Sequence, residues 1–152
     1  IFNWYSKISK EKAEKLHLAA FLQETGTILI ANEIIQDDEV VSFASEIETA
    51  PNIAEVERSY VDVSCAEVTA LVFKYWKFDE DFVNIIMYAD APQNAPEEIR
   101  EFSTALNIVK TIIPLNRPLS EGAINVGLRK AKAAGYDTDI LEDSIDFMLN
   151  LR

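Results

Sequence analysis

The sequence predicts an all-α fold, a compact bundle of about eight or nine helices, and two features of the chain support this. Apolar residues recur at spacings of three and four across almost the whole chain, as they do on one face of a helix. No stretch of useful length alternates polar and apolar residues with the period of two that marks a half-buried strand. The β-branched run at residues 27–30 lies between helix formers, so we expect a buried helix there rather than a strand.

Capping residues and helix breakers divide the N-terminal third of the chain. Ser9 can cap a first long helix, and Gly26 ends or kinks that helix. Asp37 or Asp38 can cap a later helix, which stops before Pro51.

The remaining helices carry similar start signals. Ser64 and Glu67 have the capping-box spacing, in which each side chain bonds a free backbone N–H of the first turn. Asp79 can cap the next helix, and Pro96 suits the first turn of a long one. Two final helices are expected after residues 114–122, the longest irregular stretch.

Length and composition are those of a globular domain. The chain has 152 residues, 49% of them hydrophobic, and no repeat or linker divides it, so we expect one domain over residues 1–152. Its net charge of −12 repels phosphate backbones and anionic lipid headgroups, and no apolar run approaches the roughly 18 residues of a membrane span. Nucleic acid and membranes are therefore not expected partners. With Cys65 as the single cysteine, a reducing, cytoplasmic setting fits.

Three segments, in chain order, carry a resemblance to a known family. Residues 20–26, AFLQETG, look like the Gly-Leu-Leu-His-Asp-Ile-Gly segment of the HD superfamily. Residues 57–78 are similar to a stretch that opens on a glutamate, passes a histidine and reaches a tryptophan, here Trp76. Residues 85–92, IIMYADAP, look like a Tyr-His-His-x-Pro segment. Together these segments resemble the HDOD family, the HD-related output domains of bacterial signalling proteins.

The resemblance runs from about Glu11 to Leu115 and implies both a fold and a setting. It implies a helical bundle of the HD-domain-like type and a role in bacterial signal transduction, where such domains are often fused to receiver or other regulatory domains. The family's N-terminal helical half has no counterpart here, and the chain opens on Ile1 without a methionine. We therefore expect a fragment or a processed chain that represents the C-terminal portion of a larger protein.

The residues that would hold metal in an HD site are mostly replaced. The resemblance puts Gln23, Cys65, Ala89 and Asp90 at the four imidazole positions, and His17 is the only histidine in the sequence. A hydrolytic metal needs about four converging protein ligands if it is to activate water and neutralise phosphate charge. We therefore expect no metal, no cofactor and no catalysis. One alternative stays open, because carboxylates alone can hold magnesium. The carboxylates concerned are Glu24, Asp90, Glu57 and Asp62.

The same segments predict the floor of a remodelled pocket. The polar pair Gln23 and Glu24 stands on a helix lined by apolar residues, so we expect it to face a small internal cleft rather than a dry core. Cys65 and Asp90 would share that cleft if the family fold holds. The expected vestigial pocket has six members: Gln23, Glu24, Glu57, Cys65, Ala89 and Asp90.

Several other candidate residues have structural explanations. His17 has no oriented partner for general-base work, so we expect it to be partly buried and bonded to a carbonyl or carboxylate. Cys65 is expected to act as a small buried apolar group, and Trp76 as a core residue. Glu67 is explained by its capping box, and Glu57 by bonds from a carboxylate at a helix end to nearby backbone amides.

The favoured function is a non-catalytic signalling module that works through protein–protein contacts. Trp4 and Tyr5 are candidates for an exposed interface, because they stand at the start of the chain. The expected partners are other signalling domains or proteins, and a homodimer stays open. Two alternatives remain: a residual metal-dependent phosphohydrolase acting on nucleotides, and a small-ligand sensor that uses the vestigial pocket.

Overall fold

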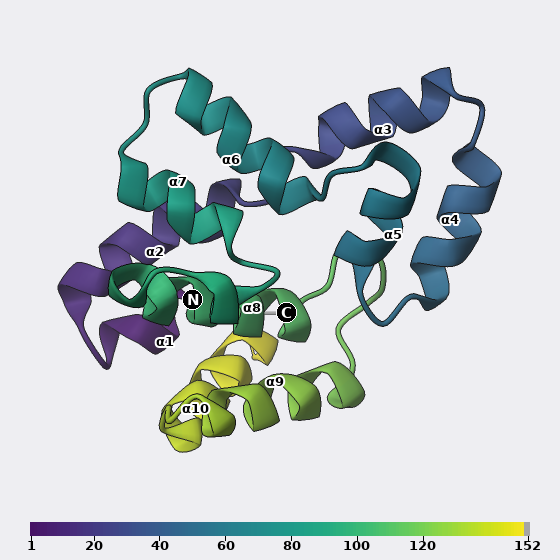
Figure 1. Cartoon of the computed structure of the whole chain (residues 1–152). Coiled ribbons are helices and arrows are strands. Elements are labelled where there is room, and N and C mark those ends of the chain that lie inside the picture. The colour runs from purple at the N-terminus through teal and green to yellow at the C-terminus, as the bar shows by residue number, and fades with distance from the viewer. Residues whose placement is uncertain (151–152) are drawn as a thin grey trace.

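The computed structural model describes residues 1–150, and every regular element in this part of the chain is a helix, which confirms the all-α prediction. Figure 1 shows α3, α4 and α5 grouped on one side, while most of the other helices gather around α8. The elements are α1 (Phe2–Ser6), α2 (Lys10–Leu22), α3 (Thr27–Gln36), α4 (Val40–Thr49), α5 (Ile53–Val61), α6 (Cys65–Tyr75), α7 (Glu80–Met87), the 3₁₀ turn η1 (Pro92–Asn94), α8 (Glu97–Ile112), α9 (Glu121–Ala133) and α10 (Thr138–Leu149).

Side-chain caps begin several helices as the sequence predicts. The hydroxyl of Ser9 accepts an N–H of the first turn of α2, and the carboxylate of Asp79 does the same for α7. The capping box of α6 is complete, because Ser64 accepts the N–H of Glu67 while the Glu67 carboxylate accepts the N–H of Ser64 at 2.7 Å. These bonds satisfy N–H groups that have no partner inside the helix.

The main core surrounds α8, which packs against α2, α7 and α9. α8 is buried on more than one side, because Leu106 and Ile108 are both fully buried although residues two positions apart point in different directions from a helix. Gly127 of α9 lies against Ile112, at a point where even a Cβ would collide with the isoleucine side chain. The two helices therefore approach closely because residue 127 has no side chain.

Trp4 and Tyr5 are buried, so the prediction that they form an exposed interface is wrong. They lie on α1, a short helix that the sequence patterns do not reveal, and their exposed fractions are 1% and 0%. Both rings meet Tyr136 edge to face, at centroid distances of 5.2 and 6.0 Å. The Tyr5 hydroxyl donates to Glu101 of α8 at 2.6 Å. Trp4 and Tyr5 therefore pack against residues of the same chain, Glu101 and Tyr136, and not against another protein.

The helices α3, α4 and α5, here called the side lobe, share a much smaller core. Ile30 and Ile34 are buried there with Cys65 of α6. Residues 27–30 are helical, as predicted. The prediction that this stretch is buried is largely wrong, because Ile28 is 73% exposed and only Ile30 is buried. α4 also begins without a side-chain cap, contrary to the expected role of Asp37 or Asp38. Asp38 instead ends the turn after α3 in a left-handed conformation, with φ of 59°.

Two aromatic or heteroaromatic side chains are more exposed than predicted. Trp76 is 59% exposed rather than a core residue, because α6 ends at Tyr75 and Phe73 takes the buried position. Its ring meets Phe73 only edge to face, at 5.8 Å. His17 is also exposed and meets the Phe2 ring at 5.5 Å, so the expectation of a partly buried, hydrogen-bonded histidine is wrong.

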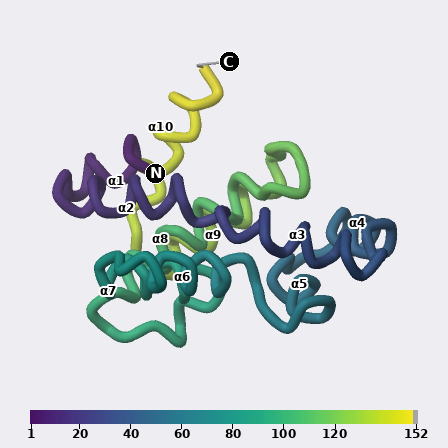
Figure 2. The backbone as a smooth tube through the Cα atoms, turned by 90° about the horizontal axis from the view of Figure 1, so that it is seen from above, coloured from purple at the N-terminus to yellow at the C-terminus, as the bar shows by residue number. Residues whose placement is uncertain are grey.

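α2 and α3 follow one another almost end to end, as Figure 2 shows from above. By length and composition alone, the combined segment Lys10–Gln36 holds an 18-residue window apolar enough to cross a membrane, with a mean hydropathy of 1.2 in that window. This is weak evidence, because core helices of globular proteins pass the same test. A turn at residues 23–26 interrupts the helical segment near its middle, and Gln23 and Glu24 lie in this turn. The absence of a membrane partner stays a prediction.

Candidate functional site

A cleft of about 790 Å³ lies where the side lobe meets the main core. α5 lines one side, and α8 with the start of α9 lines the other. The segment between α8 and α9 crosses the cleft and is tied to the end of α4 by two bonds. Asn116 donates to the carbonyl of Ile47 at 2.6 Å, and Arg117 donates to that of Ala50 at 2.9 Å.

Four of the six expected pocket residues meet at this cleft: Glu24, Glu57, Cys65 and Asp90. The Cys65 thiol lies 3.3 Å from a Glu24 oxygen, and Glu57 accepts the Cys65 backbone N–H at 2.7 Å. Glu57 therefore bonds a backbone amide at the start of α6, the kind of contact expected from the sequence. A vestigial binding role for this group stays a prediction.

The other two expected members lie behind the wall of the cleft. Gln23 is buried, and its backbone carbonyl accepts the Thr69 hydroxyl at 3.1 Å, while its side-chain carbonyl has no hydrogen-bond partner. Ala89 is fully buried, and its carbonyl accepts the Asn107 amide at 2.8 Å. Neither side chain lines the cleft.

Gly26 explains why a glycine follows the polar pair. Its N–H donates to the Thr69 hydroxyl at 2.8 Å, which holds the turn between α2 and α3 against α6. A Cβ at residue 26 would lie 2.6 Å from the Cys65 carbonyl oxygen and 2.9 Å from the Thr69 nitrogen. The turn approaches α6 this closely only because residue 26 carries no side chain.

Lys110 of α8 is the cleft residue that the sequence analysis missed. Its ammonium donates to Asp90 at 2.6 Å and lies 3.4 Å from Glu24. Burial disfavours the charged amine, but Asp90 and then Glu24 outweigh this effect and hold the pKa of Lys110 above its ordinary value. A lysine thus lies between the two carboxylates that the resemblance places near the HD metal. The signal available in the sequence was a lone cation inside the apolar run of α8, next to Val109.

On the α5–α6 side of the cleft, the pKa values of Glu57 and Cys65 are both raised, which favours their neutral forms. Burial raises the pKa of Glu57 to about 7, although the Cys65 N–H and the charge of Lys110 favour the carboxylate. Burial and the nearby Glu24 raise the pKa of the Cys65 thiol to about 12. The thiol is therefore protonated at neutral pH, which agrees with a structural rather than a reactive cysteine.

The carboxylates considered for a metal are only partly brought together at the cleft. Within residues 1–150, no three or more histidine, cysteine, aspartate or glutamate side chains gather as a metal-binding group. Asp62, one of the carboxylates considered for magnesium, caps the end of α5 in a left-handed conformation and does not line the cleft. Glu24 and Asp90 do converge, but a lysine ammonium already lies between them.

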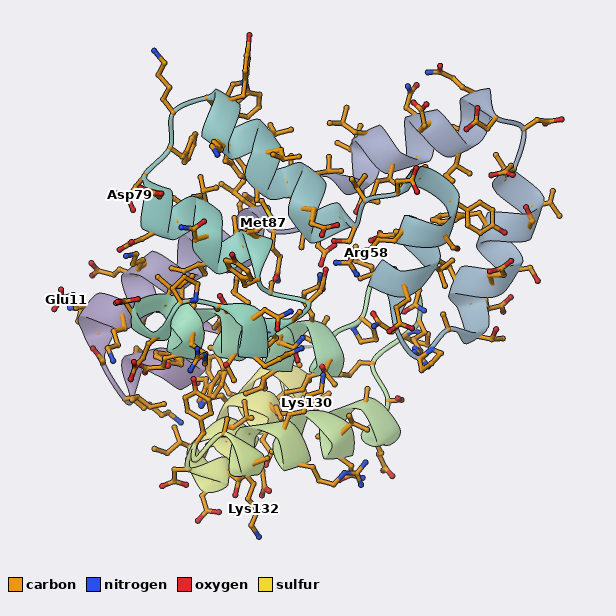
Figure 3. The ribbon with its side chains drawn as sticks, viewed as in Figure 1. Glu11, Arg58, Asp79, Met87, Lys130 and Lys132 are labelled. Atoms are coloured by element: carbon orange, nitrogen blue, oxygen red, sulfur yellow. The ribbon has the colours of Figure 1, made fainter. Side chains whose placement is uncertain are left out.

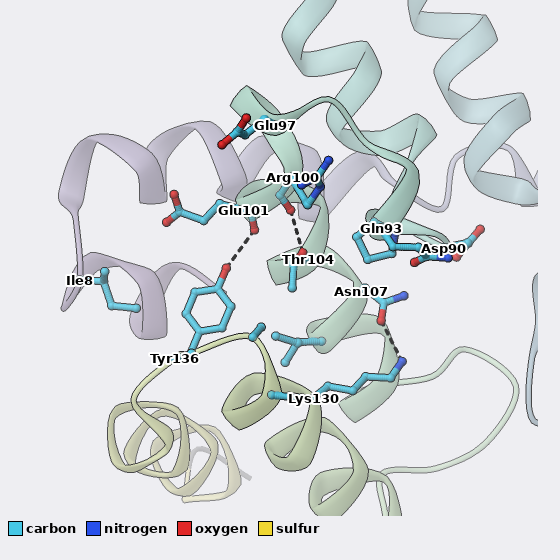
Figure 4. A pocket seen from close by; sticks show the side chains of 15 residues that line it. Ile8, Asp90, Gln93, Glu97, Arg100, Glu101, Thr104, Asn107, Lys130 and Tyr136 are labelled. Atoms are coloured by element: carbon cyan, nitrogen blue, oxygen red, sulfur yellow. Dashed lines mark hydrogen bonds between the residues drawn. The ribbon is translucent and has the colours of Figure 1, made fainter.

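A second, more open groove of about 930 Å³ runs along α8 on the side of α9. Figure 4 shows Glu101 and Tyr136 at one end of it and Asp90 at the other. Asp90, Asn107 and Lys130 line both this groove and the cleft, so they form a shared wall. Lys130 of α9, labelled in Figure 3, lies against α8, and Figure 4 shows its ammonium donating to Asn107 at 2.8 Å. The same ammonium donates to the Thr111 hydroxyl, also at 2.8 Å. The sequence analysis also missed Lys130.

Comparisons with known proteins agree with this architecture. The family profile of the HDOD domain matches residues 4–92 of the 152. The chain belongs to the HDOD family. This HDOD chain is also similar to the crystal structure of a virulence factor from Campylobacter jejuni subsp. jejuni, with a TM-score of 0.72 and 22% sequence identity. The similarity covers 91% of this chain and 54% of that one, so this chain spans about half the length of the Campylobacter protein. No curated protein matches the sequence.

Family membership supports a signalling or output-type domain. All six expected pocket residues fall inside the matched range, whereas Lys110 and Lys130 lie beyond it. At 22% identity, the likeness to the Campylobacter structure shows the fold alone.

Proposed function

We propose that this HDOD chain is a non-catalytic output module of cytoplasmic bacterial signalling, which acts through contacts with other proteins. The supporting observation is the Lys110 ammonium, which bonds Asp90 at 2.6 Å and lies 3.4 Å from Glu24. A divalent cation held by these carboxylates would meet a like charge at the same point. The ammonium offsets part of the charge of the two carboxylates, but it cannot lower the pKa of a bound water or stabilise charge on a phosphate as a metal does.

Metal analysis and an activity assay test the loss of catalysis. We expect purified protein to carry substoichiometric divalent metal and to hydrolyse no phosphomonoester or phosphodiester above the blank with added Mg²⁺ or Mn²⁺. Stoichiometric metal, with turnover that disappears in Glu24→Gln or Asp90→Asn, would contradict the proposal and favour the residual phosphohydrolase. Asp62→Asn is the matched control, because Asp62 lies outside the cleft.

Lys110→Met tests the reason for that loss. The variant keeps the length of the side chain but leaves Glu24 and Asp90 without their cation, so we expect a lower unfolding midpoint than that of the wild type. We also expect Mn²⁺ to raise the midpoint of the variant by more than it raises that of the wild type, because a ligand of the folded state stabilises it. Equal shifts would show that Lys110 does not occupy the place of a cation.

A stripe of exposed apolar residues on α2 and α3 supports the protein-contact part of the proposal. Its members recur at helical spacings along the two nearly continuous helices, with exposed fractions between 46% and 79%. They are Leu18, Phe21, Ile28, Leu29 and Ile35. Exposed apolar side chains gathered along neighbouring helices mark interaction sites more often than single exposed residues do.

Sedimentation velocity over a range of concentrations tests this stripe. We expect the wild type to self-associate weakly at high concentration through the stripe, and the double variant Phe21→Lys, Ile28→Lys to stay monomeric. Val41→Lys is the matched control, because Val41 is 84% exposed but lies on α4, outside the stripe. A wild type that stays monomeric at the highest concentration would contradict apolar association through this face.

A further inference from the structure

We propose that the cleft between α5 and α8 binds a small organic anion that also carries hydrogen-bond donors. The inference deepens the proposed function, because it depends on Lys110 rather than a metal lying between Glu24 and Asp90. It assigns the cleft a ligand class that differs from that of a metal-dependent hydrolase.

The dimensions and walls of the cleft suit a ligand of that size. Its volume of about 790 Å³ falls in the range of small-molecule sites, roughly 300–1,000 Å³. It lies at the junction of two structural units, a frequent position for such sites. Apolar side chains form much of the wall and would cover the body of the ligand: Ile47, Ile53, Ile113, Leu115 and Val126.

Two cations on the cleft have no acidic partner. Arg117 donates to the neutral carbonyl of Ala50, and Lys130 donates to the neutral Asn107 and Thr111. Neither forms an ion pair with any carboxylate within residues 1–150. The two cations provide the attraction that an anionic group needs.

Lys110 reduces the repulsion that an anion would otherwise meet. It pairs with Asp90 and Glu24, so one positive charge offsets part of the negative charge of these two carboxylates. Glu57, whose pKa burial raises to about 7, carries less than a full negative charge at neutral pH. The cleft therefore has three cations against the Glu24 and Asp90 carboxylates and a partly ionised Glu57, and the cations left without an ion pair are Arg117 and Lys130.

Two buried acceptors at the cleft lack donors. Asp90 bonds Lys110 through Oδ1, while its Oδ2 is buried without a hydrogen bond. Asn116 donates its amide to Ile47, while its Oδ1 is likewise buried without a partner. An unsatisfied buried acceptor costs roughly 1–3 kcal/mol, so a small side-chain shift that turned either oxygen toward the cleft would favour a ligand with N–H or O–H groups. An anion with such groups satisfies both requirements of the cleft.

A titration with small aromatic probes tests the proposal on the whole chain. The full probes are 4-aminophenyl phosphate and 4-aminobenzoate, which combine an apolar ring, an anion and N–H donors. Phenyl phosphate lacks the donors, and 4-aminobenzamide lacks the anion. In ¹H–¹⁵N spectra we expect shift changes to cluster on the cleft. We expect each full probe to bind at least about fivefold more tightly than its truncated counterpart, the effect of one hydrogen bond or ion pair. The ratio between the two full probes tells a phosphate site from a carboxylate site.

Variants of the cleft cations locate the anion. We expect Arg117→Gln to weaken both full probes by about tenfold, the effect of one charge-assisted bond, and to leave 4-aminobenzamide unchanged. Arg129→Gln is the matched control, because Arg129 is an exposed cation next to Lys130 that does not line the cleft. Asn116→Ala should weaken the amino probes and leave phenyl phosphate unchanged.

Two results would overturn the ligand proposal. One is the absence of cleft-localised shifts with every probe at millimolar concentration, and the other is an equal loss of affinity in Arg117→Gln and Arg129→Gln. The metal analysis described above is independent of both. Bound metal would contradict the proposed function, whereas a failed titration with metal-free protein would contradict only the ligand.

Discussion

The main core around α8 and the side lobe of α3–α5 are built from similar proportions of apolar residues but bury them very differently. In the main core, α8 packs against neighbours on several sides, and side chains such as Leu106 are fully buried. In the side lobe, two isoleucines and Cys65 are the buried members of its cluster, while Val41 is 84% exposed. A helix buries apolar surface only where a neighbour covers it, so periodicity predicts a face but does not specify what covers that face.

This difference bears on the cleft, which lies between a well-packed and a loosely packed unit. Local stability follows buried apolar contacts, so the side lobe is expected to open at a lower free-energy cost than the main core. Such an arrangement allows a ligand or partner at the cleft to bias the lobe without unfolding the molecule.

The largest expected effect separates the two regions directly. Leu106→Ala, in the main core, should lower the free energy of global unfolding by about 2–5 kcal/mol, because it leaves a cavity that the close packing around α8 cannot fill. Ile34→Ala, at 3% exposure in the side lobe, should increase amide hydrogen exchange in α3–α5 more than in α8. Chemical denaturation and exchange mass spectrometry give the two readouts. Uniform exchange changes in both variants would show that the regions unfold as one unit.

Gly26→Ala tests the joint between the two regions. The added Cβ would lie 2.6 Å from the Cys65 carbonyl and 2.9 Å from the Thr69 nitrogen, and both are backbone atoms. Because the backbone must move, we expect a loss of about 1–3 kcal/mol in the free energy of unfolding. Gly122→Ala is the control, because its nearest neighbour to an added Cβ is a Ser120 hydroxyl at 3.9 Å. Equal stability of the two variants would contradict the close approach of the turn to α6.

Glu57→Gln tests the electrostatics of the cleft. The pKa of Glu57 is about 7 in the folded chain and near 4.5 when unfolded, so the folded state binds the extra proton between these values. Stability from this group is therefore full below about pH 4.5 and is lost as pH rises through 7. The amide stays neutral and can still accept the Cys65 N–H, so we expect the variant to be more stable than the wild type at pH 8 by about 1–3 kcal/mol.

The comparison at low pH provides the control for this prediction. At pH 4 the wild-type carboxyl is protonated, so its stability and that of Glu57→Gln should be nearly equal. Denaturant melts at both pH values measure the difference. A Glu57→Gln variant that is less stable at pH 8 would show that the ionised carboxylate is favoured in the folded chain.

The sequence predicts the helices better than it predicts their surroundings. Local signals suffice for the capping box at Ser64, since a cap depends on residues three apart. The burial of Trp4 depends on Tyr136, which lies more than 130 positions away along the chain. The local sequence around Trp4 does not predict this contact. The same limit applies to the cleft. Its acidic members follow from the family motifs, whereas Lys110 enters from α8, outside the matched range.

The smallest expected effect concerns the outer face of the side lobe. Ile28→Gln replaces a side chain that is 73% exposed, so we expect the free energy of unfolding to change by no more than about 0.5 kcal/mol. Ile30→Gln, two residues further along the same helix at 3% exposure, should cost several times more, because it buries an amide without a partner. Paired denaturant melts of the two variants measure the difference. Similar losses in both, measured at a concentration at which the chain is monomeric, would contradict the exposure of Ile28 on the outer face of α3.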